Sequence, residues 1–177
     1  MQSENLIVLF DLNSFHWAQY HHAMKKKQDE ARKNKEAFNV LSFEDIAECM
    51  NYAITTHIAK NSLNRAIFYT FDENQTKKIF PLDEFDEAYM KTLNFVEVRK
   101  KIMKGLIDEL INKPFSYLPT SQLIKALSKS ICTLNKLKLR SPKTIRTSSR
   151  ILVLFNSRME NQIFAKLMNC VRSEEHT

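Results

Sequence analysis

The sequence predicts an α/β fold with a mostly parallel sheet and helices on both faces. Short apolar runs of strand length alternate along the chain with longer stretches of helical period. The runs at residues 6–10 and 151–155 are apolar throughout, as in strands covered on both faces. Strands that alternate with one-sided helices favour parallel pairing. The length of 177 residues and the 44% hydrophobic content suit a single domain.

The first elements are a buried strand and a capped helix. The strand covers residues 6–10 and delivers Asp11 to its carboxyl end. Residues 24–39 are charged and lack an apolar face, so they predict either a mobile loop or a solvated helix. Ser42 then opens a helix, with Asp45 three places on as in a capping box.

The middle of the chain predicts two strands and a second clear helix. A strand is expected at residues 66–71, and a short strand stopped by Pro81 is expected at an edge of the sheet. Residues 83–94 are acidic and predict a loop with some helix. The helical period returns over residues 95–111 and ends before Pro114.

The last third predicts helix, exposed connection, strand and helix. Residues 119–121 start a helix whose apolar side runs to Leu134. Residues 136–150 are basic and contain no acid, which indicates an exposed connection. Residues 150–155 form the next expected buried strand, and residues 159–171 an amphipathic helix.

Composition limits the classes of function. The net charge of +7 fits a nucleic-acid or acidic partner, and it also fits the lysine and asparagine bias of an AT-rich genome. Cys49, Cys132 and Cys170 are far apart and form no C-x-x-C pair, which argues against zinc or a disulfide framework in this chain. They fall on apolar faces and are expected to be buried. No run approaches the ~18–20 apolar residues of a membrane span, so no membrane partner is expected.

The ending RSEEHT, residues 172–177, does not continue the preceding helical pattern. It matches a reading frame at the start of a common sequencing-adapter oligonucleotide. We therefore expect a non-native, adapter-derived tail over these residues, with the natural chain cut after Val171.

Three blocks together resemble one family: ENLIVLFDLNSFHWAQ, ALSKSICTLNK and SSRILVLFNSRMENQIFAKLMNCV. In order and spacing they are similar to the von Willebrand A-type domain of a subunit of the general transcription and DNA-repair factor IIH core, the smaller of its two A-domain subunits. That family has a tryptophan after the first strand, here Trp17. It also has a Ser-Arg-Ile-Leu-Val strand, here residues 149–153, and a helix with Met-Asn-Cys, here residues 168–170. The family's usual glycines are missing.

The resemblance implies a partial von Willebrand A-like (Rossmann-like) domain over residues 1–171, truncated after the fourth strand and its helix. The strand at residues 150–155 would pair with the first strand and leave its other edge bare, so we expect marginal stability and a tendency to aggregate. The implied role is a non-catalytic nuclear scaffold in transcription and nucleotide excision repair, not an enzyme. Its partners would be other subunits of the factor IIH core (TFIIH core complex), chiefly the zinc-binding region of the larger A-domain subunit, with DNA contacted only indirectly. The resemblance implies no cofactor in this fragment, because the zinc belongs to an absent C-terminal domain.

The residues after the first strand suggest a degenerate metal site. A-domains hold Mg²⁺ with Asp-x-Ser-x-Ser through oxygen ligands, often through water. Here Asp11 and Asn13 can supply oxygens, Phe15 cannot, and Thr120 stands where a supporting hydroxyl is expected. We therefore predict no bound metal, with Asp11 capping a nearby backbone amide instead.

The alternative function is a PIN-like, Mg²⁺-dependent nuclease that uses Asp11. Such enzymes also end the first strand in Asp-x-Asn and gather further acids from helices around the metal. Asp45, Asp108 and Glu109 are the acids available here. Capping explains Asp45, and the other two lie on the polar face of a periodic helix.

The predicted partner contacts are Phe15, His16 and Trp17 in a loop at the carboxyl edge of the sheet, where open α/β sheets form binding crevices. Trp17 can equally fill the core. The nearby His21 and His22 permit a metal trio with His16, but no helical register is evident to bring the three together.

The basic connection contains candidate contacts to a nucleic-acid backbone, although a solvated loop is the simpler interpretation. It lacks interleaved aromatic residues, so stacking on bases is not expected. The candidates are Lys136, Lys138, Arg140, Lys143 and Arg146.

Overall fold

A computed structural model of the protein describes residues 2–82, 84–92, 94–115, 117–118, 122–140, 142 and 144–157. The predicted helix at residues 159–171 and the predicted tail at residues 172–177 lie outside the described residues. The described elements, in chain order, are β1 (Gln2–Asp11), α1 (Ser14–Lys33), α2 (Phe43–Lys60), β2 (Arg65–Phe71), β3 (Thr76–Phe80), α3 (Glu84–Lys91), α4 (Phe95–Asn112), α5 (Leu123–Arg140) and β4 (Arg146–Leu154).

The strands form one mostly parallel sheet, as the sequence predicts. Their order is β3-β2-β1-β4, with β1 parallel to both β2 and β4. β3 is antiparallel to β2 and lies at an edge, which confirms the edge strand predicted before Pro81. The last described strand pairs with the first, as expected, and Leu6 lies between Ala66 and Arg150 in the register.

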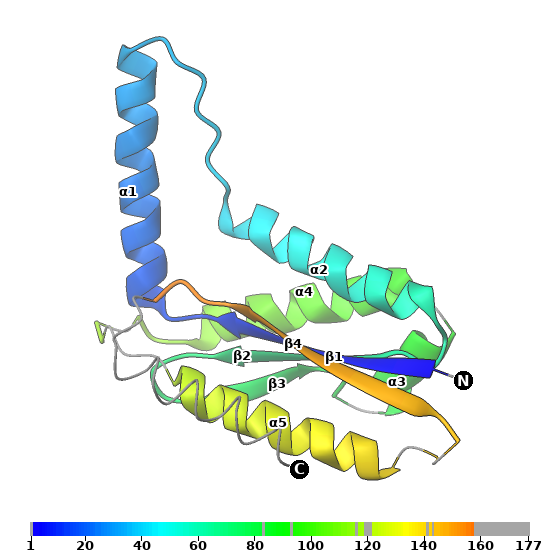
Figure 1. Ribbon diagram of the computed structural model, residues 1–177. Helices are drawn as coiled ribbons and strands as arrows, with labels where there is room; N and C mark the ends of the chain where they lie inside the picture. Colours follow the sequence, from blue (N-terminus) through cyan, green and yellow to red (C-terminus); the bar gives the residue numbers. More distant parts are fainter. Residues whose placement is uncertain are drawn as a thin grey trace.

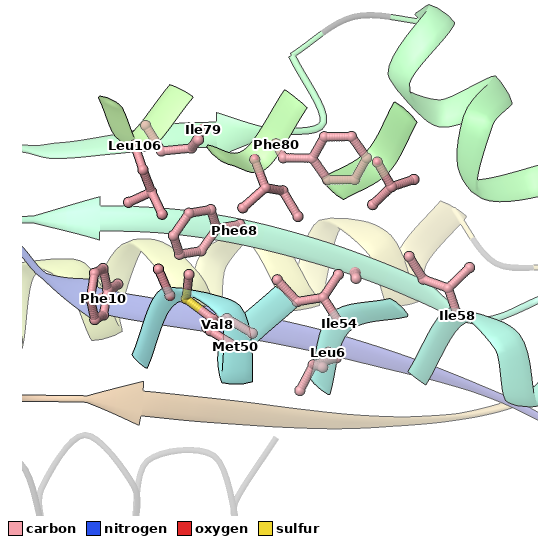
Figure 2. Packing of buried hydrophobic residues seen from close by; sticks show 14 of the residues in the cluster. Leu6, Val8, Phe10, Met50, Ile54, Ile58, Phe68, Ile79, Phe80 and Leu106 are labelled. Carbon is pink, nitrogen blue, oxygen red and sulfur yellow. The ribbon is translucent and has the colours of Figure 1, made fainter. Parts of the chain in front are cut away.

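Side chains of β1 alternate between two apolar cores, one on each face of the sheet. On one face, Leu6, Val8 and Phe10 contact α2 and α4, and Figure 2 shows them beside Met50 and Ile54 of α2. The other face, which carries Ile7 and Leu9, packs on α5. Both faces of β1 are therefore buried, which explains its unbroken apolar run.

Gly105, the only glycine of the chain, lies inside α4 where that helix crosses β3. A Cβ at this position would overlap Ile79 Cγ2. Glycine in a helix interior costs about 1 kcal/mol relative to alanine. The close approach of the helix to β3 accounts for it here.

The capping box predicted at the start of α2 is confirmed. The Asp45 amide donates to Ser42 Oγ at 3.1 Å, and the Ser42 amide donates to Asp45 Oδ2 at 2.8 Å. These hydrogen bonds lower the pKa of the Asp45 carboxyl. The predicted burial of Cys49 and Cys132 is wrong, since both are exposed on helix faces turned away from the sheet, and Cys170 lies outside the described residues.

Residues 24–33 belong to a solvated helix, one of the two alternatives that the sequence left open. They form the outer part of α1, which stands away from the sheet in Figure 1 before the chain returns to α2. Its buried residues are His16, near the base, and Ala31, whose carbonyl accepts a hydrogen bond from the Glu36 amide of the returning chain. The 20-residue helix therefore keeps its charged side chains in water.

Two predictions for the last third of the chain are wrong. Residues 136–140 and 146–150 are not part of a connecting loop, because α5 continues to Arg140 and β4 begins at Arg146, although the described basic side chains are exposed as expected. β4 is also not a buried strand: Leu152 is 40% exposed and Ile151 and Val153 are only partly buried. Among the described strands β4 lies at the edge of the sheet, so it lacks the neighbours that cover β1. The expected marginal stability stays a prediction.

His57 joins β1 to β2 at the amino end of the sheet. Its Nε2 lies 3.1 Å from the Glu4 carbonyl and 3.2 Å from the Arg65 carbonyl. Burial lowers the pKa of the imidazole below its ordinary 6.5, although both carbonyls and the Glu4 carboxylate oppose the shift. The neutral imidazole is therefore the form that the fold favours.

Stability should fall as the pH drops below about 6.5, because the unfolded chain then binds a proton at His57 that the folded chain resists. We predict that His57→Gln reduces this acid loss of unfolding free energy, measured by urea titration at about pH 7.5 and 5.5. His22→Gln, at an exposed position on α1, is the control and should keep the wild-type slope. An unchanged slope in His57→Gln would show that other groups are responsible.

Candidate functional site at the carboxyl edge of the sheet

Asp11 ends β1 in a nearly dry position, with 1% of its surface exposed. Ser157, just after β4, donates its hydroxyl to Asp11 Oδ2 at 2.7 Å. The Asn13 amide donates to Asp11 Oδ1 at 2.9 Å. Burial raises the pKa of the Asp11 carboxyl, and these two hydrogen bonds work against that rise. Both carboxylate oxygens are therefore bound to donors of the chain itself.

Asn13, the second candidate metal ligand, is the N-cap of α1. Its Oδ1 accepts from the amides of Phe15 at 3.0 Å and His16 at 3.3 Å, and its Nδ2 donates to the Leu118 carbonyl at 3.0 Å. The structure thus brings Asp11 and Asn13 together but engages their oxygens in capping the chain. Thr120 lies outside the described residues.

A cation does lie at this edge, and it is the ammonium group of Lys113, just beyond α4. Lys113 Nζ is 3.1 Å from the Leu12 carbonyl, 2.9 Å from Asp72 Oδ2 and 3.5 Å from Glu73 Oε2. The side chains of Asp72 and Glu73 are 7% and 2% exposed. Two buried acids after β2 therefore share one tethered ammonium, which also lies within hydrogen-bond distance of a carbonyl after β1.

The turn after β2 fixes these acids in place. Asp72 Oδ1 accepts from the amides of Asn74 at 2.6 Å and Gln75 at 2.9 Å. Gln122, just before α5, donates its amide to the Asp72 carbonyl and its side chain to the Glu73 carbonyl. From the sequence, DENQ reads only as a polar turn. The sequence signal that could have revealed the cation is the pair of adjacent acids, Asp72 and Glu73, directly after a buried strand.

The predicted partner contacts are not in a loop, because Phe15, His16 and Trp17 form the first turn of α1. Trp17 packs on Phe10 and Phe43, with ring centroids at 5.8 and 5.0 Å, and donates its indole N–H to the Asp11 carbonyl at 2.7 Å. It therefore packs against the core while part of its surface stays exposed, and a contact with a partner stays a prediction.

Of the other two predicted contacts, His16 is buried, and Phe15 keeps partial exposure. The expectation that the nearby histidines lack a helical register is wrong, since His16, His21 and His22 all lie on α1. Among the described residues, no group of three or more His, Cys, Asp or Glu side chains is placed to hold a metal ion.

Two of the three acids proposed for a nuclease are used elsewhere. Asp45 belongs to the capping box of α2, and Glu109 forms an ion pair with Lys77. Asp108 lies beside Glu109 on α4. The described residues therefore give the nuclease alternative no support.

An exposed apolar surface adjoins the same edge and was missed by sequence reasoning. We call it the edge patch; it begins in the last turn of α4 and continues in the chain that follows. Phe115 and Tyr117 contact each other at a ring-centroid distance of 5.0 Å, and the Leu118 carbonyl is the acceptor for Asn13. The residues and their exposed fractions are Leu110 42%, Ile111 75%, Phe115 53%, Tyr117 80% and Leu118 56%. An exposed apolar patch of this kind marks an interaction surface.

The candidate nucleic-acid contacts lie at the other end of the sheet. Lys136, Lys138 and Arg140 end α5, and Arg146 begins β4, where it pairs in register with Gln2. Lys143 lies outside the described residues. Because β1 runs from Gln2 to Asp11, this basic end and the edge patch are separated by the length of the strand.

The topology is that of a von Willebrand A-type domain: a mostly parallel sheet with an antiparallel edge strand, helices on both faces, and an aspartate at the carboxyl end of β1. A crystal structure of the TFIIH p34 N-terminal domain has this fold and is similar to the chain with a TM-score of 0.71. The match covers 98% of this chain and 76% of the other at 17% sequence identity. No protein-family model and no curated protein sequence matches the chain.

The ammonium of Lys113 should be required for folding. Lys113→Met leaves two buried carboxylates without their cation, and we predict a loss of about 3 kcal/mol in unfolding free energy, measured by urea titration. Adding Asp72→Asn and Glu73→Gln to the same variant should recover part of that loss. Lys77→Met is the matched control, because Lys77 forms an ion pair with its side chain 54% exposed and should cost about 1 kcal/mol or less. Equal losses in the two lysine variants would contradict the assignment.

Proposed function

We propose that this chain is a non-catalytic docking domain of a subunit of the factor IIH core. The observation that carries the proposal is the likeness of fold to the TFIIH p34 N-terminal domain over nearly the whole chain. The proposal includes a nuclear location and a scaffold role in transcription and nucleotide excision repair. DNA is contacted only indirectly, through other subunits. Within the described residues, no helix is long and apolar enough to cross a membrane.

The carboxyl edge supports docking better than chemistry. The oxygens of its buried acids already accept from Ser157, Lys113 and backbone amides, so a substrate or a metal would have to displace these donors. The edge patch beside them offers what an interface needs, an exposed apolar centre with aromatic side chains and a polar surround. We propose that Phe115 and Tyr117 make the principal contacts, with partly exposed Phe15 beside them.

The proposed partner is the zinc-binding region of the larger A-domain subunit. This partner is the one that the family resemblance in the sequence implies. We place the contact at the edge patch and not at Trp17, because Trp17 packs against the core. Aromatic side chains at the centre of an interface commonly contribute most of its binding energy. Zinc in this assembly would belong to the partner and to a C-terminal domain of the subunit.

Co-expression with the factor IIH core subunits tests the proposal. The tagged full chain should retain the larger A-domain subunit in magnesium-free buffer, since no metal at Asp11 is involved. Phe115→Ser with Tyr117→Ser should weaken that capture by about tenfold or more, as loss of a central aromatic pair does. Leu139→Ser is the matched control, because Leu139 is an 86% exposed apolar residue on α5, and it should leave capture unchanged.

Two outcomes would contradict the proposal. Failure of the wild-type chain to retain any core subunit would remove the assignment to this assembly. Retention that is equal in the aromatic double variant and the Leu139→Ser control would remove the edge patch from the interface.

A further inference from the structure

Among the described helices, α5 is the one that contains no acidic residue, and it carries five lysine or arginine residues. No acid occurs in the sequence between Glu109 and Glu160. The helix packs on the face of the sheet opposite to α2 and α4, as Figure 1 shows. The layer that α5 forms therefore carries charge of one sign.

Four of these cations lie on one flank of α5, and we call them the basic row. At 3.6 residues per turn they fall within about 60° of one another around the helix axis, and they extend over about 22 Å at 1.5 Å per residue. Lys138, the fifth cation, lies on the opposite flank. The members of the basic row, all exposed, are Lys125, Lys129, Lys136 and Arg140.

Strand β3 adds a cation beside the basic row. Lys129 Nζ lies 5.4 Å from the centre of the Tyr69 ring. Lys78 is paired in register with Tyr69, so it points to the same face of the sheet. Glu87 of α3 shares the wall of a small cavity with Leu137 of α5. Within the described residues, however, neither Lys78 nor any member of the basic row forms an ion pair with a carboxylate.

The needs of the fold do not account for the basic row. Lys125 and Lys129 are four residues apart, as are Lys136 and Arg140, and like charges at this spacing destabilise a helix. Lys125 also lies in the first turn, where the helix dipole favours acids. Only the cations near the carboxyl end of α5 gain from that dipole. A line of repelling charges kept at the surface points to an anionic partner.

We propose that the basic row, together with Lys78, binds an extended acidic segment of a partner protein. About seven residues of extended chain span the length of the row at about 3.3 Å per residue. Helix α5 has no aromatic side chain on which a base could stack, and the row is a single line of charge where duplex DNA has two backbones. An acidic protein segment therefore matches the row better than a nucleic acid. No member of the row belongs to the edge patch, so this contact is additional to the one proposed above.

The probe is a fluorescein-labelled peptide of about nine alternating aspartate and glutamate residues, titrated with the full chain and followed by fluorescence anisotropy. Binding should saturate at about 50 mM salt and weaken about tenfold at about 200 mM salt, because exposed charges are screened. The matched peptide of asparagine and glutamine should not bind. Failure of the wild-type chain to bind the acidic peptide would overturn the proposal.

Charge reversal tests whether the row itself is responsible. Lys125→Glu with Lys136→Glu should weaken binding of the acidic peptide by about tenfold or more. Lys25→Glu with Lys26→Glu is the matched control, because it makes the same change of net charge at exposed positions of α1, and it should cost less than about threefold. Equal losses in the two double variants would show that only net charge matters and would overturn the proposal.

Two further measurements complete the test. Lys125→Glu alone suits the first turn of α5, so it should keep the wild-type melting temperature and still weaken binding about threefold, which separates binding from a folding defect. A DNA duplex of about 12 base pairs is titrated in parallel. Tighter binding of the duplex than of the peptide, with the same loss in the row variants, would assign the row to nucleic acid and contradict the proposal.

Discussion

Acidic side chains at the carboxyl ends of β1 and β2 lie in a nearly dry layer, and each must find a partner there. An unpaired buried charge costs several kcal/mol, a large share of the stability of a domain this size. Asp11 meets this requirement with Ser157 and the Asn13 amide, while Asp72 and Glu73 meet it with Lys113. These partners come from the chain after β4, the start of α1 and the end of α4. The need to pair these buried acids thus holds the segments after β4, before α1 and after α4 close to the carboxyl edge of the sheet.

The same constraint explains why the edge suits docking. In an A-type domain the carboxyl end of the first strand is where a divalent cation would be held by oxygen ligands. Here the oxygens of the corresponding acids are already bound by donors of the chain, so we infer that binding at this edge depends on apolar contact. The aromatic pair of the edge patch follows Lys113 closely in sequence, and its neighbour Leu118 is bonded to the cap residue Asn13. The segment that begins at Lys113 therefore both binds the two acids and carries the aromatic pair of the edge patch.

Local patterns predicted the elements well and the site poorly. The apolar run before Asp11 and the spacing of Ser42 and Asp45 depend on neighbours in sequence, and the structure has both features as expected. The exposure of β4 and the partners of Asp11 depend on residues far apart, such as Ser157, which no periodicity reveals. The sequence left open whether residues 24–33 of α1 are helical, because a polar helix in water has no apolar stripe from which it can be predicted.

The most direct test of an edge whose acids are bound by the chain itself is a crystal structure of the full chain grown in millimolar Mn²⁺, with anomalous diffraction to locate the metal. We predict no manganese peak within about 2.5 Å of Asp11, Asp72 or Glu73, and density for the Lys113 ammonium between the Leu12 carbonyl and the two acids. A manganese ion bound to Asp11, with Lys113 turned out to solvent, would contradict the account.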